Sequence, residues 1–130
     1  METSVRYIVG DTQAAIEFYE LLGFEVVAHP GPGFAMLRRD GLRLLLNTPG
    51  GGGGAGQDAD GATPAPGGWN RFQVTVDDID AEIDRLGRHG VRFRSAVIDG
   101  QGGRQVLADD PSGNPIELFQ ARGTGPGRER

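Results

Sequence analysis

Apolar residues alternate with polar ones in short runs along most of the chain, and two longer stretches show helical spacing instead. In the first of these, Ile16, Tyr19 and Leu22 recur every three residues between Asp11, a type that often starts a helix, and Gly23, a type that often ends one. We therefore expect helices over about 11–22 and 78–88. The expected strands are 5–9, 24–28, 34–39, 42–47, 71–76, 91–97, 104–108 and 115–120.

The second half of this pattern repeats the first. Asp78 follows Asp11 by 67 residues, Gly90 follows Gly23 by the same interval, and the apolar positions between these anchors are in step. Each half consists of a strand, a helix and three strands, which predicts an α+β fold of two tandem βαβββ modules. A repeat of two units normally forms one closed domain with a site between its halves. The expected boundaries are 1–122 for the domain and 1–48 and 68–122 for the modules.

The segment between the modules, 49–67, is rich in glycine and nearly devoid of large apolar residues, so we expect a flexible connector there. It is either a plain linker or a mobile cover over a binding cavity. A phosphate-binding loop is a poorer interpretation, because no Gly-Lys-Ser or Gly-Lys-Thr follows it at the start of a helix. We expect the tail 123–130 to be disordered.

The composition narrows the classes of partner. The 130 residues carry a net charge of −5 and no basic cluster, which argues against a nucleic-acid partner. No apolar run reaches the roughly 18 residues that cross a membrane, and no export signal is recognisable. The absence of cysteine is consistent with a reducing compartment, so we expect a cytoplasmic protein.

The faces of two predicted strands indicate where polar chemistry gathers. Arg71 and Gln73 alternate with apolar residues and so share the face that a helix would leave uncovered. Trp69 has the same parity, which makes it either a platform for a ligand or a residue that closes the core edge or a subunit contact. Glu117 lies on the corresponding face of the last strand. A carboxylate there needs a partner, and Arg71 is a suitable one.

Two motifs within this pattern point to a known family. They are the run from Phe18-Tyr19 to Leu22-Gly23-Phe24 and the closing segment Asp110-Pro111-Ser112-Gly113-Asn114-Pro115-Ile116-Glu117-Leu118. With the doubled βαβββ order, the chain resembles the vicinal oxygen chelate superfamily, also called the glyoxalase/bleomycin-resistance/dioxygenase fold. The resemblance implies a curved mixed sheet around a central cavity, a small-molecule ligand and a homodimer. It does not decide the function, because the fold hosts metal-dependent enzymes as well as metal-free drug-binding proteins.

The resemblance also implies where a metal would bind in this chain. Metal-using members take one ligand from the first strand and one from the last strand of each module. The first-strand positions fall on Ser4 and Arg71, the last strand of the first module, 42–46, has no carboxylate, and the second module keeps Glu117. A guanidinium at such a site repels a divalent ion. We therefore expect no metal and no cofactor, with Glu117 as the one candidate ligand.

These considerations favour a receptor over a catalyst. The hypothesis is a metal-free protein that sequesters an apolar or aromatic natural product or antibiotic, with no catalytic residue. The expected ligand-binding residues are Trp69, Arg71, Gln73, Glu117, Phe34, Met36, Arg38 and Arg6.

Two alternatives stay open. The first is an enzyme of the glyoxalase, lyase or dioxygenase type with an atypical metal site. The second is metal-free catalysis with Glu117 as a general base, which a neighbouring Arg71 would weaken by favouring the ionised carboxylate.

Overall fold

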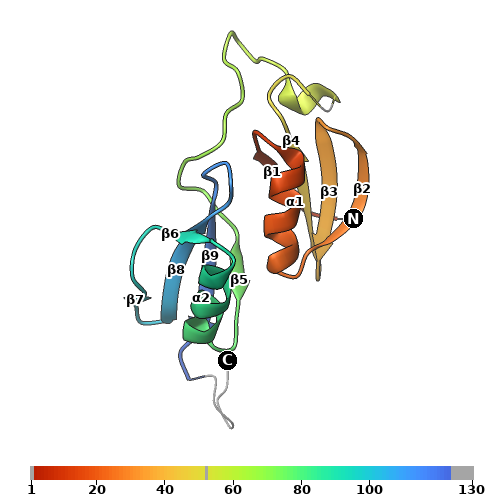
Figure 1. Ribbon diagram of the computed structural model, residues 1–130. Helices are drawn as coiled ribbons and strands as arrows, with labels where there is room; N and C mark the ends of the chain where they lie inside the picture. Colours follow the sequence, from red (N-terminus) through yellow and green to blue (C-terminus); the bar gives the residue numbers. More distant parts are fainter. Residues whose placement is uncertain (1, 52, 124–130) are drawn as a thin grey trace. The chain divides into compact units, whose positions relative to one another are not determined.

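The computed structural model describes residues 2–51 and 53–123, and the chain divides into two compact units. The first unit comprises Met1–Trp69 together with Asp110–Asn114, and the second comprises Asn70–Asp109 together with Pro115–Arg130. Each unit contains one mixed sheet and one long helix (Figure 1). The α+β class is thus confirmed, with the described strands in two sheets.

The sheet of the first unit has four strands in the order β1-β4-β3-β2, and β1 and β4 run parallel. Its elements are β1 (Ser4–Ile8), α1 (Thr12–Leu21), β2 (Glu25–Gly31), β3 (Phe34–Arg39) and β4 (Leu42–Asn47). Helix α1 covers one face of this sheet (Figure 1). Its buried residues Ile16 and Tyr19 share the core with Leu37, Leu44 and Leu46 of the strands.

Local signals in the first unit act as the sequence predicts. The carboxylate of Asp11 accepts a hydrogen bond from the Ala14 amide at 3.1 Å and caps the start of α1. Gly23 follows the helix with a φ of +89°, a conformation that suits glycine. Asp40, with a φ of 51°, and Gly41 connect β3 to β4, so the predicted hairpin is confirmed.

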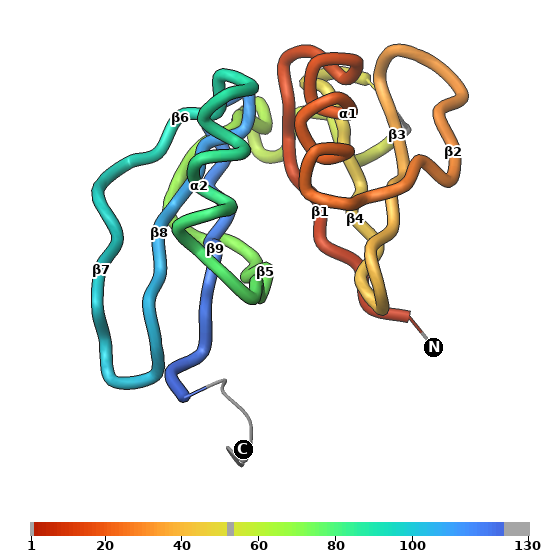
Figure 2. The backbone as a smooth tube through the Cα atoms, turned by 60° about the horizontal axis from the view of Figure 1, so that its bottom comes forward, coloured from red at the N-terminus to blue at the C-terminus, as the bar shows by residue number. Residues whose placement is uncertain are grey.

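The sheet of the second unit follows the order β5-β9-β8-β6, and β7 also pairs with β8. Its elements are β5 (Gln73–Thr75), α2 (Ile79–Arg88), β6 (Arg92–Phe93), β7 (Ile98–Asp99), β8 (Gly103–Asp109) and β9 (Pro115–Ala121). Helix α2, capped by Asp78, lies over β9 (Figures 1 and 2). Its buried residues Ile79 and Leu86 pack into a core with Val106 and Leu118.

The continuous strand predicted over 91–97 is wrong. Residues 92–93 and 98–99 form two short strands, and residues 94–96 between them form bends, with the Arg94 amide still bonded to the Leu107 carbonyl at 2.9 Å. Phe93 pairs with Ala108 but Ile98 pairs with Gln105, so the segment has two residues more than its partner strand. Because two extra residues keep the two-residue alternation of apolar and polar positions in phase, the sequence pattern does not reveal this bulge. The strand predicted over 71–76 is also shorter, since β5 covers only 73–75.

The connector between β4 and β5 has some local structure. A single turn of 3-10 helix, η1 (Gly53–Gly56), folds back on the end of β4, and the Gly50 amide donates to the Gly56 carbonyl at 2.5 Å. A Cβ atom on Gly56 would lie 2.3 Å from the Thr48 carbonyl oxygen, so this close approach requires glycine. Of the predicted tail 123–130, residues 124–130 lie outside the described part of the chain. No helix among the described residues is long and apolar enough to cross a membrane.

Candidate functional site

The sheet face of the first unit that points away from α1, here called the distal face, carries four of the predicted ligand-binding residues. Strand register places its side chains in three rows. They are Ile8, Asn47 and Phe34; then Arg6, Leu45 and Met36; then Ser4, Arg43 and Arg38. The structure therefore brings Arg6, Phe34, Met36 and Arg38 together on one surface.

The first two rows combine apolar side chains with one cation. Phe34, Met36 and Leu45 are half-buried, whereas Arg6 is exposed. The Arg6 guanidinium donates through Nη1 to the side-chain oxygen of Asn47, whose exposed fraction is 0%. A buried amide thus holds an exposed guanidinium beside an apolar strip.

The third row is a network of charged groups. Arg38 lies 2.8 Å from one carboxylate oxygen of Glu2, Arg43 lies 3.1 Å from the other, and Arg43 also donates to Ser4 Oγ at 2.9 Å. The hydrogen bond from Arg38 is the main cause that lowers the pKa of Glu2 below its usual value. Glu2 therefore stays ionised and offsets part of the positive charge in this row.

In the second unit, Arg71, Gln73 and Glu117 form a closed group on the sheet face away from α2. Arg71 Nε and Nη2 each lie 3.1 Å from Glu117 Oε1, and Gln73 Nε2 donates to Oε2 at 2.8 Å. The predicted ion pair between Arg71 and Glu117 is present, and Gln73 completes it. Glu117 is only 8% exposed, so these donors compensate for the loss of its hydration.

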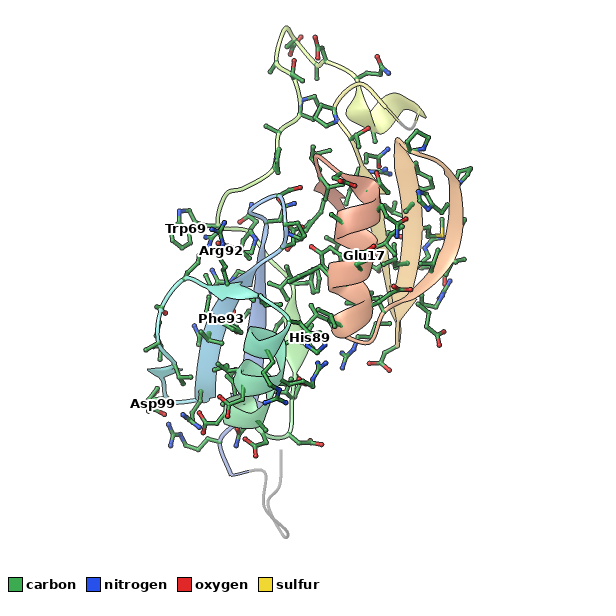
Figure 3. The ribbon with its side chains drawn as sticks, viewed as in Figure 1. Glu17, Trp69, His89, Arg92, Phe93 and Asp99 are labelled. Carbon is green, nitrogen blue, oxygen red and sulfur yellow. The ribbon has the colours of Figure 1, made fainter. Side chains whose placement is uncertain are left out.

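Trp69 differs in its setting from the other predicted residues. It lies outside β5, so the strand parity that assigned its direction does not reach it. Its side chain is 70% exposed and projects from the loop (Figure 3). Its role as a ligand platform stays a prediction.

The positions at which the resemblance implies metal ligands do not fit a metal. In the parallel strand pairs Gln73 lies opposite Glu117, and Arg6, 67 residues before Gln73, lies opposite Leu45. A leucine therefore stands in the first module where Glu117 stands in the second. Ser4 Oγ accepts a hydrogen bond from Arg43, and Arg71 is a cation. The set offers one carboxylate and a repelling guanidinium.

Within residues 2–51 and 53–123, no three His, Cys, Asp or Glu side chains come close enough to hold an ion.

Sequence reasoning missed a buried polar cluster in the first unit. Tyr19 donates its hydroxyl to Asp110 Oδ2 at 2.7 Å, while Asp110 Oδ1 accepts from the amides of Ser112 and Asn114 at 2.9 Å. The Asn114 side chain donates to the Ile8 carbonyl at 2.7 Å. Burial, reinforced by the negative charge of Asp110, raises the pKa of Tyr19 well above its usual value. The sequence motif 110–114 predicts the turn that contains Asp110, but nothing in the sequence indicates that Tyr19 bonds to it.

Asn47 was also missed, because a lone asparagine at the end of a predicted strand carries no signal. Only the register that places it between Ile8 and Phe34, and the bond from Arg6, give it a place in the site.

Comparison with known proteins agrees with this architecture. Residues 3–118 match the model of the Glyoxalase/Bleomycin resistance protein/Dioxygenase superfamily. No curated protein matches the sequence.

The solved structures similar to the chain include the following three. A superfamily member from Sphaerobacter thermophilus is 28% identical with a TM-score of 0.72, over 92% of this chain and 96% of that one. TnmS3, an antibiotic binding protein from Streptomyces sp. CB03234, is 26% identical with a TM-score of 0.69, over 93% and 95%. The lactoylglutathione lyase from Agrobacterium tumefaciens is 22% identical with a TM-score of 0.72, over 92% of both chains, a likeness of fold alone.

Proposed function

Because the chain belongs to the Glyoxalase/Bleomycin resistance protein/Dioxygenase superfamily, we propose that it is a metal-free protein that binds an apolar or aromatic small molecule and holds it without transforming it. In this role it would protect a cell by sequestering a natural product or antibiotic. The observation that carries the proposal is that both carboxylate oxygens of Glu117 are engaged, one by Arg71 and one by Gln73.

The engaged carboxylate argues against a metal-binding role. A divalent ion would have to displace the guanidinium 3.1 Å from Oε1 and the amide 2.8 Å from Oε2, and would place its own positive charge beside that of Arg71. Leu45, opposite Arg6, supplies no second carboxylate.

The distal face supports binding of a molecule with an apolar body. Phe34, Met36 and Leu45 form a half-buried apolar strip. Arg6 lies beside Leu45 on the neighbouring strand, and Arg38 follows Met36 along β3. Small-molecule sites commonly combine an apolar lining with a few polar groups that set orientation. The likeness to TnmS3, an antibiotic binding protein, points the same way.

The retained Glu117 favours one alternative, an enzyme of the glyoxalase, lyase or dioxygenase type with an atypical metal site. Glu117 as a general base is the weaker alternative, because donors already occupy both oxygens. A homodimer and a cytoplasmic location stay predictions.

Metal uptake tests the proposal directly. Protein purified without chelator is mixed with Ni, Zn, Fe(II) or Mn, desalted and analysed by mass spectrometry for bound metal. We expect far less than one equivalent per chain. Uptake near one equivalent that is lost in Glu117→Ala but kept in Glu17→Ala, an exposed glutamate on α1, would overturn the proposal and favour the enzyme.

A further inference from the structure

The charges on the distal face are balanced everywhere except at Arg6. Arg38 and Arg43 share Glu2, and Glu25 lies opposite Arg38 in the register of β2 and β3. These two cations and two carboxylates cancel. Within the described part of the chain, Arg6 forms no ion pair, and its guanidinium donates to the neutral side-chain oxygen of Asn47.

The position of Arg6 is also defined. Its Cα lies opposite Leu45 in the second row, but its guanidinium is bonded to Asn47 in the first row, so the side chain extends along the sheet toward the row that holds Phe34. Asn47 is itself fixed, because it is fully buried and its backbone carbonyl accepts from the Val9 amide at 2.9 Å. The face therefore presents a positioned positive charge beside an aromatic ring.

We infer that the molecule bound at this face is an organic anion, with an apolar or aromatic body on Phe34, Met36 and Leu45 and a carboxylate, sulfonate or phenolate against Arg6. The inference rests on the proposed function and adds the charge of the ligand to it. Guanidinium groups bind such oxygen anions through charge-assisted hydrogen bonds. Since the whole chain carries a net charge of −5, the attraction for an anion is local to this residue.

Asn47 is a positioning residue in this scheme. A carboxylate in its place would neutralise the guanidinium without removing it. Asn47→Asp should therefore abolish the preference for anions while Arg6 is still present, an effect that loss of packing alone would not produce.

Two fluorescent dyes with the same body test the inference. One is 8-anilinonaphthalene-1-sulfonate, and the other, N-phenyl-1-naphthylamine, lacks the sulfonate. Dissociation constants are measured for the native chain, Arg6→Met, Asn47→Asp and Phe34→Ala. Arg88→Met is the matched control, since it removes an arginine at the end of α2 that also forms no ion pair with a carboxylate among the described residues.

We expect the native chain to prefer the sulfonate dye. Arg6→Met and Asn47→Asp should raise the dissociation constant of the sulfonate dye by about 10- to 100-fold, the range for one hydrogen bond to a charged group. The dissociation constant of the neutral dye should change by less than about twofold. Phe34→Ala should weaken the binding of both dyes, and Arg88→Met should weaken the binding of neither. Thermal unfolding of each variant verifies that it is folded, and Arg6→Met, an exchange at an exposed side chain, carries the test if Asn47→Asp does not fold.

The possible failures are distinguishable. If both dyes bind equally well, if only the neutral dye binds, or if Arg6→Met behaves like Arg88→Met, the inference about charge is wrong and the binding proposal stands. If Arg6→Met weakens both dyes equally, Arg6 acts through packing and the inference is again wrong. If the native chain binds neither dye, the inference and the binding proposal both fail.

Discussion

Removal of the Tyr19 hydroxyl should destabilise the first unit, and the size of the effect should depend on pH. Tyr19 is 0% exposed and donates at 2.7 Å to Asp110 Oδ2. A hydrogen bond to a charged group contributes about 1.5–3 kcal/mol. After Tyr19→Phe, the one side-chain bond left to that carboxylate oxygen from the described residues is the 3.1 Å bond from Asn114. We expect Tyr19→Phe to lower the free energy of unfolding by about 1.5–3 kcal/mol at pH 8.

The pH dependence follows from the direction of the pKa shift. Burial and the neighbouring Asp110 raise the pKa of Tyr19 in the folded state well above 10, its value in the unfolded chain. The contribution of Tyr19 is therefore fully present below pH 10 and is lost as the pH rises above it, because only the unfolded state then releases the proton. The loss is about 1.4 kcal/mol per pH unit. Tyr19→Phe lacks this titration, so its deficit should shrink by about 1.4 kcal/mol between pH 9 and pH 11.

Urea unfolding followed by circular dichroism at pH 8, 9, 10 and 11 measures both effects. A double-mutant cycle with Asp110→Ala gives the coupling between the two side chains, which we expect to reach about 1–3 kcal/mol. A deficit below about 0.5 kcal/mol at pH 8, or one that does not change between pH 9 and pH 11, would refute the reasoning.

Three further predictions concern single residues. Trp69→Ala should weaken ligand binding, measured by calorimetry, without moving the unfolding midpoint; unchanged affinity would remove Trp69 from the site. Gly103→Ala should lower the free energy of unfolding by more than about 2 kcal/mol, because its Cβ would lie 2.2 Å from the Gln120 carbonyl oxygen, and a loss below about 0.5 kcal/mol would contradict this contact. Asp11→Ala should lower the free energy of unfolding, measured with urea, by about 1 kcal/mol because α1 loses its cap, whereas Asp11→Asn should keep most of that stability. Equal losses in the two variants would show that capping is not the cause.

The strand faces show how far sequence reasoning reaches into the site. The alternation that placed Arg71 and Gln73 on one face, and Glu117 on the matching face of the last strand, is confirmed by the hydrogen bonds among them. Arg71 lies just before β5, where the Phe72 carbonyl still accepts from the Glu117 amide at 3.0 Å, whereas Trp69 lies further from the strand and its face is not assigned by parity. Parity assigns a side chain to a face only within the strand itself, and strand ends depend on pairing partners.

The sequence by itself determined the local elements and their order. Asp11, Gly23 and the Asp40-Gly41 pair act on backbone groups within about four residues, and the repeat of 67 residues gave the doubled module. Tertiary structure alone decided which distant groups meet: Arg6 and Asn47 are 41 residues apart, and Tyr19 and Asp110 are 91 apart. The Arg6–Asn47 contact depends on strand register, and a slip of one residue would turn each side chain to the opposite face without changing the apolar pattern of the sequence. The Tyr19–Asp110 contact joins α1 to the turn between β8 and β9, and it depends on how these distant segments pack.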